Sequence, residues 1–237
     1  MITVTDYRMD KSAVEKLSEF GFYNISLKPW SALPGGIASH PDMLIFVLDD
    51  ILLTHIDYYQ CNKTAIDAIT GKANLKLLTT DEAVGSKYPA DVLFNAAVVS
   101  KYLIANLNFV SKKILALCEQ KGLIPVHINQ GYAKCSICVV SGKAVITSDE
   151  GICETLKKET DIDVLKTEKG HIDLYQYDYG FIGGATGGFG DKIFFCGDIR
   201  LHPDSEKILK FLKKHGKTAV SLTDKPLCDV GTVFCFK

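Results

Sequence analysis

The sequence has 237 residues, of which 47% are hydrophobic and 23% are charged, so the chain can build a core and intrinsic disorder is excluded. Its 27 Lys and Arg residues balance 28 Asp and Glu residues, which argues against nucleic-acid and membrane-surface partners. The N-terminus shows no export signal and no long stretch lacks charge, so we expect a cytoplasmic protein whose eight cysteines are reduced.

The chain begins with a predicted strand, helix and strand. The hydrophobic pattern places them at Ile2–Thr5, Ser12–Phe20 and Tyr23–Leu27. Gly21 follows the helix directly, as expected for a helix end.

The next two segments share the order strand, strand, helix, strand. In the first segment these elements are predicted at Met43–Leu48, Ile51–His55, Asn62–Ile69 and Leu75–Leu78. In the second, which is the clearest copy, they are predicted at Asp91–Val99, Tyr102–Ala105, a helix from Ser111 that ends at Gly122, and Leu123–Ile128.

Two further copies follow. The third has strands at Ser136–Val140 and Ala144–Ile146, a helix from Asp149, and a strand at Ile162–Leu165. The fourth has strands at Phe181–Ile182 and Ile193–Cys196, a helix from Pro203 to Gly216, and a strand at Thr218–Leu222. A long glycine turn is predicted to join its first two strands.

A last strand, Thr232–Phe236, completes the N-terminal half-unit and closes a ring. The second strands recur about every 47 residues, a period typical of repeat architectures. The sequence therefore predicts a single α/β domain over residues 1–237, a five-bladed α/β propeller with pseudo-five-fold symmetry. The blades are expected at about 230–237 with 1–29, 40–80, 90–129, 134–167 and 179–223. An open α/β sheet is the alternative.

The stretch Tyr88-Pro-Ala-Asp-Val-Leu-Phe-Asn95, continued through Lys113-Ile-Leu115, resembles a segment of dimethylarginine hydrolases. With the five repeats, it makes the chain similar to the pentein superfamily of guanidino-group-modifying enzymes, and most similar to a clostridial-type branch. The resemblance implies that Asp91 holds a cationic guanidinium group, which a carboxylate binds by bidentate hydrogen bonds.

The chain departs from the superfamily's catalytic pattern. Tyr132 stands where the resemblance places a catalytic His, and Val230-Gly-Thr-Val233 stands where it places the nucleophilic Cys. Cys228 precedes that position by two or three residues. The resemblance therefore leaves open whether the chain catalyses the superfamily's chemistry.

Candidate ligand-binding residues precede the first strands of the blades. They are Asp42, Asp91, Asp178 and Asp229, with Tyr132 and Lys134 in the remaining blade. Pseudo-symmetry would gather these carboxylates at one mouth of the channel, where they would favour a cation. Asp is also common in turns before strands, which is the structural alternative.

Candidate catalytic residues are Cys228 as a thiol nucleophile and His40 or His171 as proton carriers. Cys228 requires a basic neighbour that lowers its pKa. Cys135 and Cys138 are expected in the core. Four glycines are expected in a mobile lid over the channel: Gly183, Gly184, Gly187 and Gly188. Their loop leads into a strand rather than a helix, so no nucleotide site is expected.

Three functions remain open at this point. The first is binding of a small cation, guanidino or amine, in the central channel. The second is hydrolysis of guanidino C–N bonds, as in an amidinohydrolase or deiminase, by a rearranged site with Cys228. The third is a non-catalytic interaction protein. No metal, cofactor, nucleic acid or membrane is expected, and a homodimer is left open.

Overall fold

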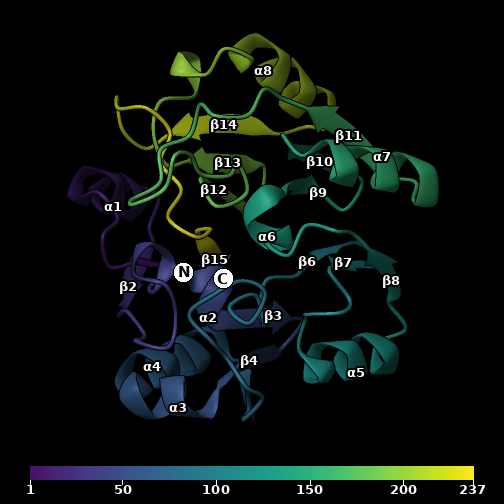
Figure 1. Cartoon of the computed structure of the whole chain (residues 1–237). Helices are drawn as coiled ribbons and strands as arrows, with labels where there is room; N and C mark the ends of the chain where they lie inside the picture. Colours follow the sequence, from purple (N-terminus) through teal and green to yellow (C-terminus); the bar gives the residue numbers. More distant parts are fainter.

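Five three-stranded sheets form a ring, and the helices that cross between the second and third strands of each sheet lie on its outside (Figure 1). The structure is a computed structural model that describes all of residues 1–237. In sheet order the strands are β15 (Phe234–Phe236), β1 (Ile2–Asp6) and β2 (Tyr23–Leu27); β3 (Ile45–Leu48), β4 (Ile51–His55) and β5 (Lys76–Thr80); β6 (Ala97–Val99), β7 (Tyr102–Ala105) and β8 (Ile124–His127); β9 (Cys138–Ser141), β10 (Ala144–Thr147) and β11 (Asp163–Lys166); β12 (Thr186–Phe189), β13 (Lys192–Phe195) and β14 (Thr218–Ser221). The predicted five-bladed α/β fold is confirmed.

Each blade repeats the same pairing, with its first two strands antiparallel and its last two parallel. Parallel neighbours need a crossover, which helices provide in every blade. These helices are α1 (Lys11–Glu19), α3 (Ile56–Cys61), α4 (Lys63–Ala73), α5 (Lys112–Gln120), α7 (Glu150–Glu159) and α8 (Ser205–Lys214). None of the helices has the length and apolar character needed to cross a bilayer.

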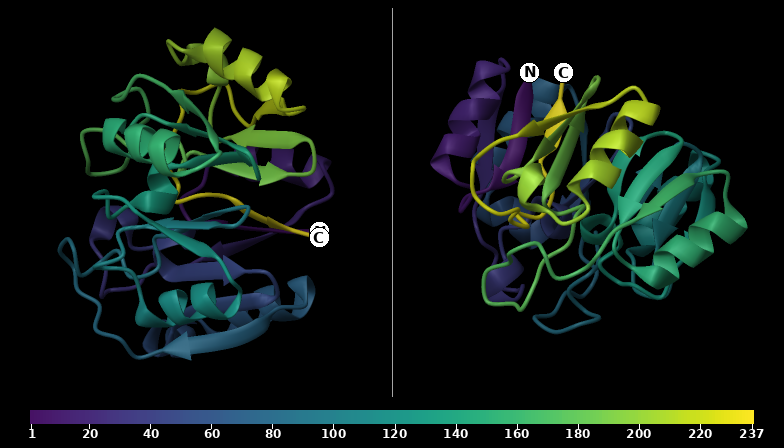
Figure 2. Two further views of the ribbon diagram at one scale, coloured as in Figure 1. Left: turned by 90° about the vertical axis from the view of Figure 1, so that its right-hand side faces the viewer. Right: turned by 90° about the horizontal axis from the view of Figure 1, so that it is seen from above.

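The ring closes through the two ends of the chain. β1 pairs antiparallel with β15, so that Ile2 lies opposite Phe236 and Val4 opposite Phe234. The two termini lie side by side in Figure 2. The predicted closure through the terminal strands is therefore confirmed.

Three predicted first strands begin later than expected. β6 begins at Ala97 rather than Asp91, β3 follows a helical turn, α2 (Pro41–Leu44), and β9 follows another, α6 (Ala133–Ser136). The residues before these strands are apolar and buried, and an apolar run alone does not distinguish a strand from other buried backbone. These turns and loops lie at the centre of the ring, where they form the site.

The fourth full blade contains a larger error of prediction. Its first strand is β12, inside the glycine run, and not Phe181–Ile182. A Cβ atom on Gly187 would lie 2.4 Å from the carbonyl oxygen of Val233, so the glycine permits close backbone approach next to the C-terminal strand. The hairpin turn is short and lies at Gly190, which has positive φ.

A polar side chain at or just beyond the end of every middle strand forms a second five-fold repeat. Each accepts a hydrogen bond from the backbone N–H two residues later and is buried. These residues are Asp6, His55, Asn106, Thr147 and Asp198. The backbone role is shared although the residue type is not, which hides the repeat in the sequence.

Candidate functional site

A cavity of ≈ 240 Å³ lies among the segments that lead into the first strands. Its walls are mostly apolar and are supplied by Ile37, Leu174, Tyr132, Tyr177, Tyr179 and Phe181. Its polar lining consists of His40, Cys135, Asp178 and Asp229. Because these residues come from four different blades, the cavity exists only in the closed ring.

Asp229 is a buried carboxylate in the cavity wall. Its oxygens accept hydrogen bonds from the backbone N–H groups of Phe181 and Gly231, both at 2.9 Å. Its one ion-pair partner is His40, whose Nδ1 lies 3.7 Å from Oδ1. Burial is the main cause that raises the pKa of Asp229 to about 6; His40 opposes this rise, and the nearby Asp42 contributes to it. The charge of Asp229 is therefore poorly compensated in the empty cavity.

His40 lies between two carboxylates. Its Nε2 is 3.8 Å from Oδ2 of Asp6, and its buried Nδ1 makes no hydrogen bond. Gly231 packs directly against it, with φ +71°, and a Cβ atom there would lie 2.2 Å from Cβ of His40. No other residue type fits at Gly231, the second residue of the segment where the superfamily resemblance places a nucleophile.

Cys135 is held at the cavity wall by two hydrogen bonds. Its Sγ accepts from Nδ2 of Asn95 at 3.0 Å and donates to Oδ2 of Asp42 at 3.2 Å. The same oxygen of Asp42 accepts from the hydroxyl of Thr232, whereas its Oδ1 is buried without a partner. Burial raises the pKa of Cys135 well above its usual value, and Asp42 and Asp229 add to this.

Asp91 does not line the cavity itself but is hydrogen-bonded to Tyr132, which does. Its Oδ2 accepts from the hydroxyl of Tyr132 at 2.7 Å, and its Oδ1 is buried without a partner. Burial raises the pKa of Asp91, and the Tyr132 bond opposes the shift. The structure therefore places Tyr132, and not Asp91 itself, in the wall.

Asp6 is the buried acid that does have a strong cationic partner. Arg8 donates from Nε and Nη2 to its two oxygens, at 3.1 and 2.7 Å, and the hydroxyl of Ser39 also donates to it. Arg8 additionally donates to the carbonyls of Gly35 and Gly36, which fixes the loop beside the cavity. Asp91 and Asp229 differ from Asp6 in that neither carboxylate has a Lys or Arg partner.

Cys228, which the sequence proposes as a thiol nucleophile, does not line the central cavity. It is half-buried, and its backbone bridges to that of Asp173. Burial, followed by Asp229, Asp173 and Asp6, raises its pKa to about 11, and the opposing effect of Arg8 is smaller. Arg8 is a basic neighbour of Cys228, but its effect on the pKa is smaller than the combined effect of burial and the three carboxylates.

Two further candidates also lie elsewhere. His171 is exposed, with Nε2 3.5 Å from Glu168 and its ring against His202. Lys134 donates from Nζ to Thr232 and does not line the cavity. Asp178 does line it, from an exposed position in the loop after β11.

The glycines expected in a lid are packed into the ring. Gly183, Gly184 and Gly187 are buried, and only Gly188 is exposed. A Cβ atom on Gly184 would lie 1.9 Å from Oδ1 of Asp229. This packing contradicts the expected mobile lid, because the segment forms the buried approach to β12 and that strand itself.

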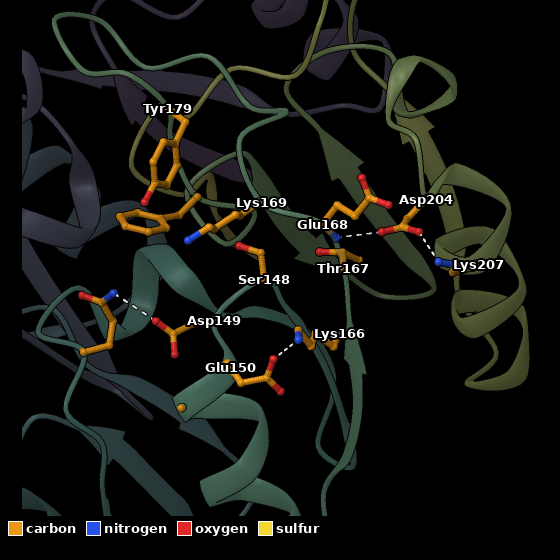
Figure 3. A pocket seen from close by; sticks show the side chains of 13 residues that line it. Ser148, Asp149, Glu150, Lys166, Thr167, Glu168, Lys169, Tyr179, Asp204 and Lys207 are labelled. Carbon is orange, nitrogen blue, oxygen red and sulfur yellow. Dashed lines mark hydrogen bonds and ion pairs between the residues drawn. The ribbon is translucent and has the colours of Figure 1, made fainter.

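A larger, more polar cavity of ≈ 660 Å³ adjoins the first, and Tyr179 and Phe181 line both. Figure 3 shows Lys169 extending toward Tyr179, and Lys169 makes no ion pair. The hydroxyl of Thr167, also in this wall, is buried without a partner. The other lysines of the wall, Lys166 and Lys207, are paired with carboxylates.

Sequence reasoning missed Cys135, Asn95 and the Arg8–Asp6 pair. The sequence predicts Cys135 only as a core residue just before a strand, and it is buried, but it lies in the helical turn α6 at the cavity wall. The available signal was positional, because Cys135 precedes a first strand just as the candidate acids do. No group of three or more side chains is arranged to hold a metal ion.

The chain matches the model of a protein family described as "Family of unknown function (DUF6873)" over residues 4–234. No curated protein sequence matches it.

Solved structures with the same fold include three enzymes. They are DDAH from Pseudomonas aeruginosa complexed with citrulline (7% identity, TM-score 0.56, covering 94% of this chain and 92% of that one), an agmatine deiminase from C. jejuni (11%, 0.55, 94% and 87%), and an amidinotransferase from Microseira wollei in the saxitoxin biosynthetic pathway (11%, 0.55, 91% and 76%). At these identities the likeness establishes the pentein fold alone.

Proposed function

Because the chain belongs to the DUF6873 family and has the pentein fold, we propose from the site itself that the central cavity binds a small organic cation, a guanidinium or an amine. The observation that carries this proposal is the pairing of an aromatic wall with buried carboxylates that have no Lys or Arg partner. Structures of similar fold include a DDAH complexed with citrulline and an agmatine deiminase, which supports the same ligand class.

The aromatic wall favours an organic cation over a hydrated inorganic one. Tyr132, Tyr177, Tyr179 and Phe181 present ring faces or edges to a cavity of ≈ 240 Å³. Aromatic faces attract guanidinium and alkylammonium groups, which shed their water more easily than small metal ions do. The volume lies below the roughly 300–1,000 Å³ typical of drug-sized ligands, so it suits a head group.

The carboxylates supply the charge. Burial raises the pKa values of both Asp229 and Asp91, which means that their anionic forms are disfavoured in the empty protein. A cation in the cavity would contact Asp229 directly and would lie close to Asp91 behind Tyr132. Its binding would therefore restore the charge balance that Arg8 already provides for Asp6.

The adjoining polar cavity would hold the part of the ligand beyond its cationic head group. Since Tyr179 and Phe181 line both spaces, a ligand whose head fills the central cavity directs its other end toward Lys169 and Thr167. A polar or carboxylate-bearing tail fits this wall, because Lys169 has no ion pair and the Thr167 hydroxyl has no partner.

The test is calorimetry with arginine, agmatine, methylated arginines and simple alkylamines, using wild type and two matched variants. Tyr177→Leu removes a ring from the cavity wall, whereas Tyr175→Leu removes an exposed ring of the same loop that does not line the cavity. We expect Tyr177→Leu to weaken binding by about tenfold, and Tyr175→Leu to leave it nearly unchanged. If no compound binds wild type, or if both variants bind alike, the proposed site is wrong.

A further inference from the structure

We propose that Cys135 is the reactive thiol of this protein and that it forms a covalent bond with an electrophilic amidinium bound in the central cavity. The inference rests on the proposed cation site but goes beyond it, because binding alone requires no nucleophile. It assigns the thiol to the turn before β9, in place of Cys228.

The first argument is position. Among the eight cysteines only Cys135 lines the central cavity. It shares the wall with His40 and Asp229, so a thiol, an imidazole and a carboxylate face one space of ≈ 240 Å³. A ligand bound in that space would therefore lie beside Cys135, which is part of the cavity wall.

The second argument is orientation. Nδ2 of Asn95 donates to the sulfur at 3.0 Å, while Oδ1 of Asn95 accepts from the backbone N–H groups of Lys134 and Cys135. Asn95 thus fixes both the turn and the thiol. A donor to sulfur stabilises the thiolate relative to the thiol, and Oδ2 of Asp42 at 3.2 Å is placed to accept the thiol proton.

The third argument is the polar capacity left unused around the thiol. Nδ1 of His40 and Oδ1 of Asp42 are both buried without a partner, and each residue is 1% exposed. Buried polar atoms in folded proteins nearly always have partners, so these atoms indicate a ligand that supplies them. Of the two, His40 lines the central cavity, so an amidinium bound there can donate an N–H group to its Nδ1.

The charges around Cys135 make its reactivity conditional. Burial, followed by the nearby carboxylates of Asp42 and Asp229, raises the pKa of Cys135 and favours the protonated sulfur. A bound cation cancels the repulsion from these carboxylates and favours the thiolate. Cys135 should therefore react rapidly with cationic electrophiles and slowly with neutral ones of similar size.

The covalent step for a suitable probe, 2-chloroacetamidine, is an ordinary displacement. The Sγ–C bond forms, the C–Cl bond breaks and chloride leaves with the bonding pair. The thiol proton passes to Asp42. The neutral analogue 2-chloroacetamide undergoes the same displacement without the positive charge.

The experiment treats the full chain with each reagent at equal concentration and locates the adducts by peptide mass spectrometry. We expect 2-chloroacetamidine to label Cys135 at least about tenfold faster than 2-chloroacetamide does. The exposed thiol of Cys61 is the internal control and should show no such preference. Cys135→Ser should abolish the fast phase, and Cys228→Ala should leave it unchanged.

Two outcomes would overturn the inference: preferential labelling of Cys228, or equal rates for the two reagents at Cys135. Calorimetry separates this failure from that of the proposed function. If arginine or an amine binds wild type and Cys135→Ser alike but Cys135 is not labelled, the reactive thiol is wrong and the cation site stands. If no cation binds wild type, the cation site itself is wrong. Asp42→Asn, which keeps the shape, should reduce the preference for the amidine.

Discussion

The hydroxyl of Tyr132 donates a 2.7 Å hydrogen bond to the carboxylate of Asp91, and the two residues belong to neighbouring blades. Cys135, three residues after Tyr132, makes a similar hydrogen bond, in which its thiol donates to the carboxylate of Asp42. Both side chains of the α6 segment that face the cavity are therefore backed by a buried acid from another blade.

Removing the Tyr132 hydroxyl should destabilise the protein. Tyr132→Phe leaves Asp91 buried with neither oxygen paired to a side chain, and we expect the free energy of unfolding to fall by about 1–3 kcal/mol at pH 7. Burial raises the pKa of Asp91, so the loss should shrink as the pH falls and Asp91 becomes protonated. Tyr102→Phe is the control, because Tyr102 makes a bond of equal length to the exposed Asp161. Urea unfolding of both variants checks this, and equal losses would contradict it.

Arg8 and Arg200 offer a second matched pair. Each binds the Asp two residues before it, but Asp6 also lies beside His40 of the cavity wall and Arg8 is partly buried, whereas the Arg200 side chain is 78% exposed. Arg8→Ala should lower the free energy of unfolding by about 1–3 kcal/mol, because it leaves a buried carboxylate without its cation. Arg200→Ala should have a smaller effect, since the Arg200 side chain is largely exposed and water already screens its interaction with Asp198. A larger loss of unfolding free energy in Arg200→Ala than in Arg8→Ala would contradict the role given to Arg8 as the cation that neutralises buried Asp6.

Asp229 should make cation binding depend on pH. Its pKa is about 6 in the folded protein, against about 3.9 for an ordinary Asp, so in the ligand-free protein its contribution to stability falls as the pH rises from about 4 to about 6. A cation prefers the ionised form, so affinity should rise through pH 6 and level off above it. Calorimetry between pH 5 and pH 8 measures this, and Asp229→Asn, once shown to fold, should flatten the profile.

The close approach of Gly231 to His40 predicts a severe effect of a single methyl group. Gly231→Ala combines the strain of positive φ with a Cβ atom 2.2 Å from that of His40, and should cost at least about 3 kcal/mol. Gly122→Ala is the control, because Gly122 has φ +66° with open space around it, and it should cost about 1 kcal/mol. Thermal unfolding of both variants measures these costs. Similar decreases in stability would show that the contact with His40 adds nothing to the cost of positive φ.

The fold could be predicted from the sequence because buried middle strands such as β7 give uninterrupted apolar runs, and glycines such as Gly122 and Gly216 mark helix ends. The first strands were predicted poorly. Near the axis, backbone is buried whether or not it is a strand, so the apolar run from Asp91 and the glycine run around β12 have no distinctive period.

The site was predicted only in part for a related reason. Four residues predicted near the starts of first strands, His40, Tyr132, Asp178 and Asp229, line one cavity in the structure. Sequence position could not show that Tyr132 screens Asp91, or that Cys228 is turned out of the wall while Cys135 is turned into it. Those outcomes depend on side-chain contacts between blades far apart in the sequence, which no local pattern contains.

The antiparallel pairing of β1 with β15 also limits how this architecture can change over evolution. A linear solenoid can gain or lose a whole repeat, because its ends are free and each unit contacts only its neighbours. Here the last strand must meet the first, so a duplicated or deleted blade would leave no partner in register. The turns that enter the first strands and the loops between blades, which shape the cavity, can change without breaking this pairing.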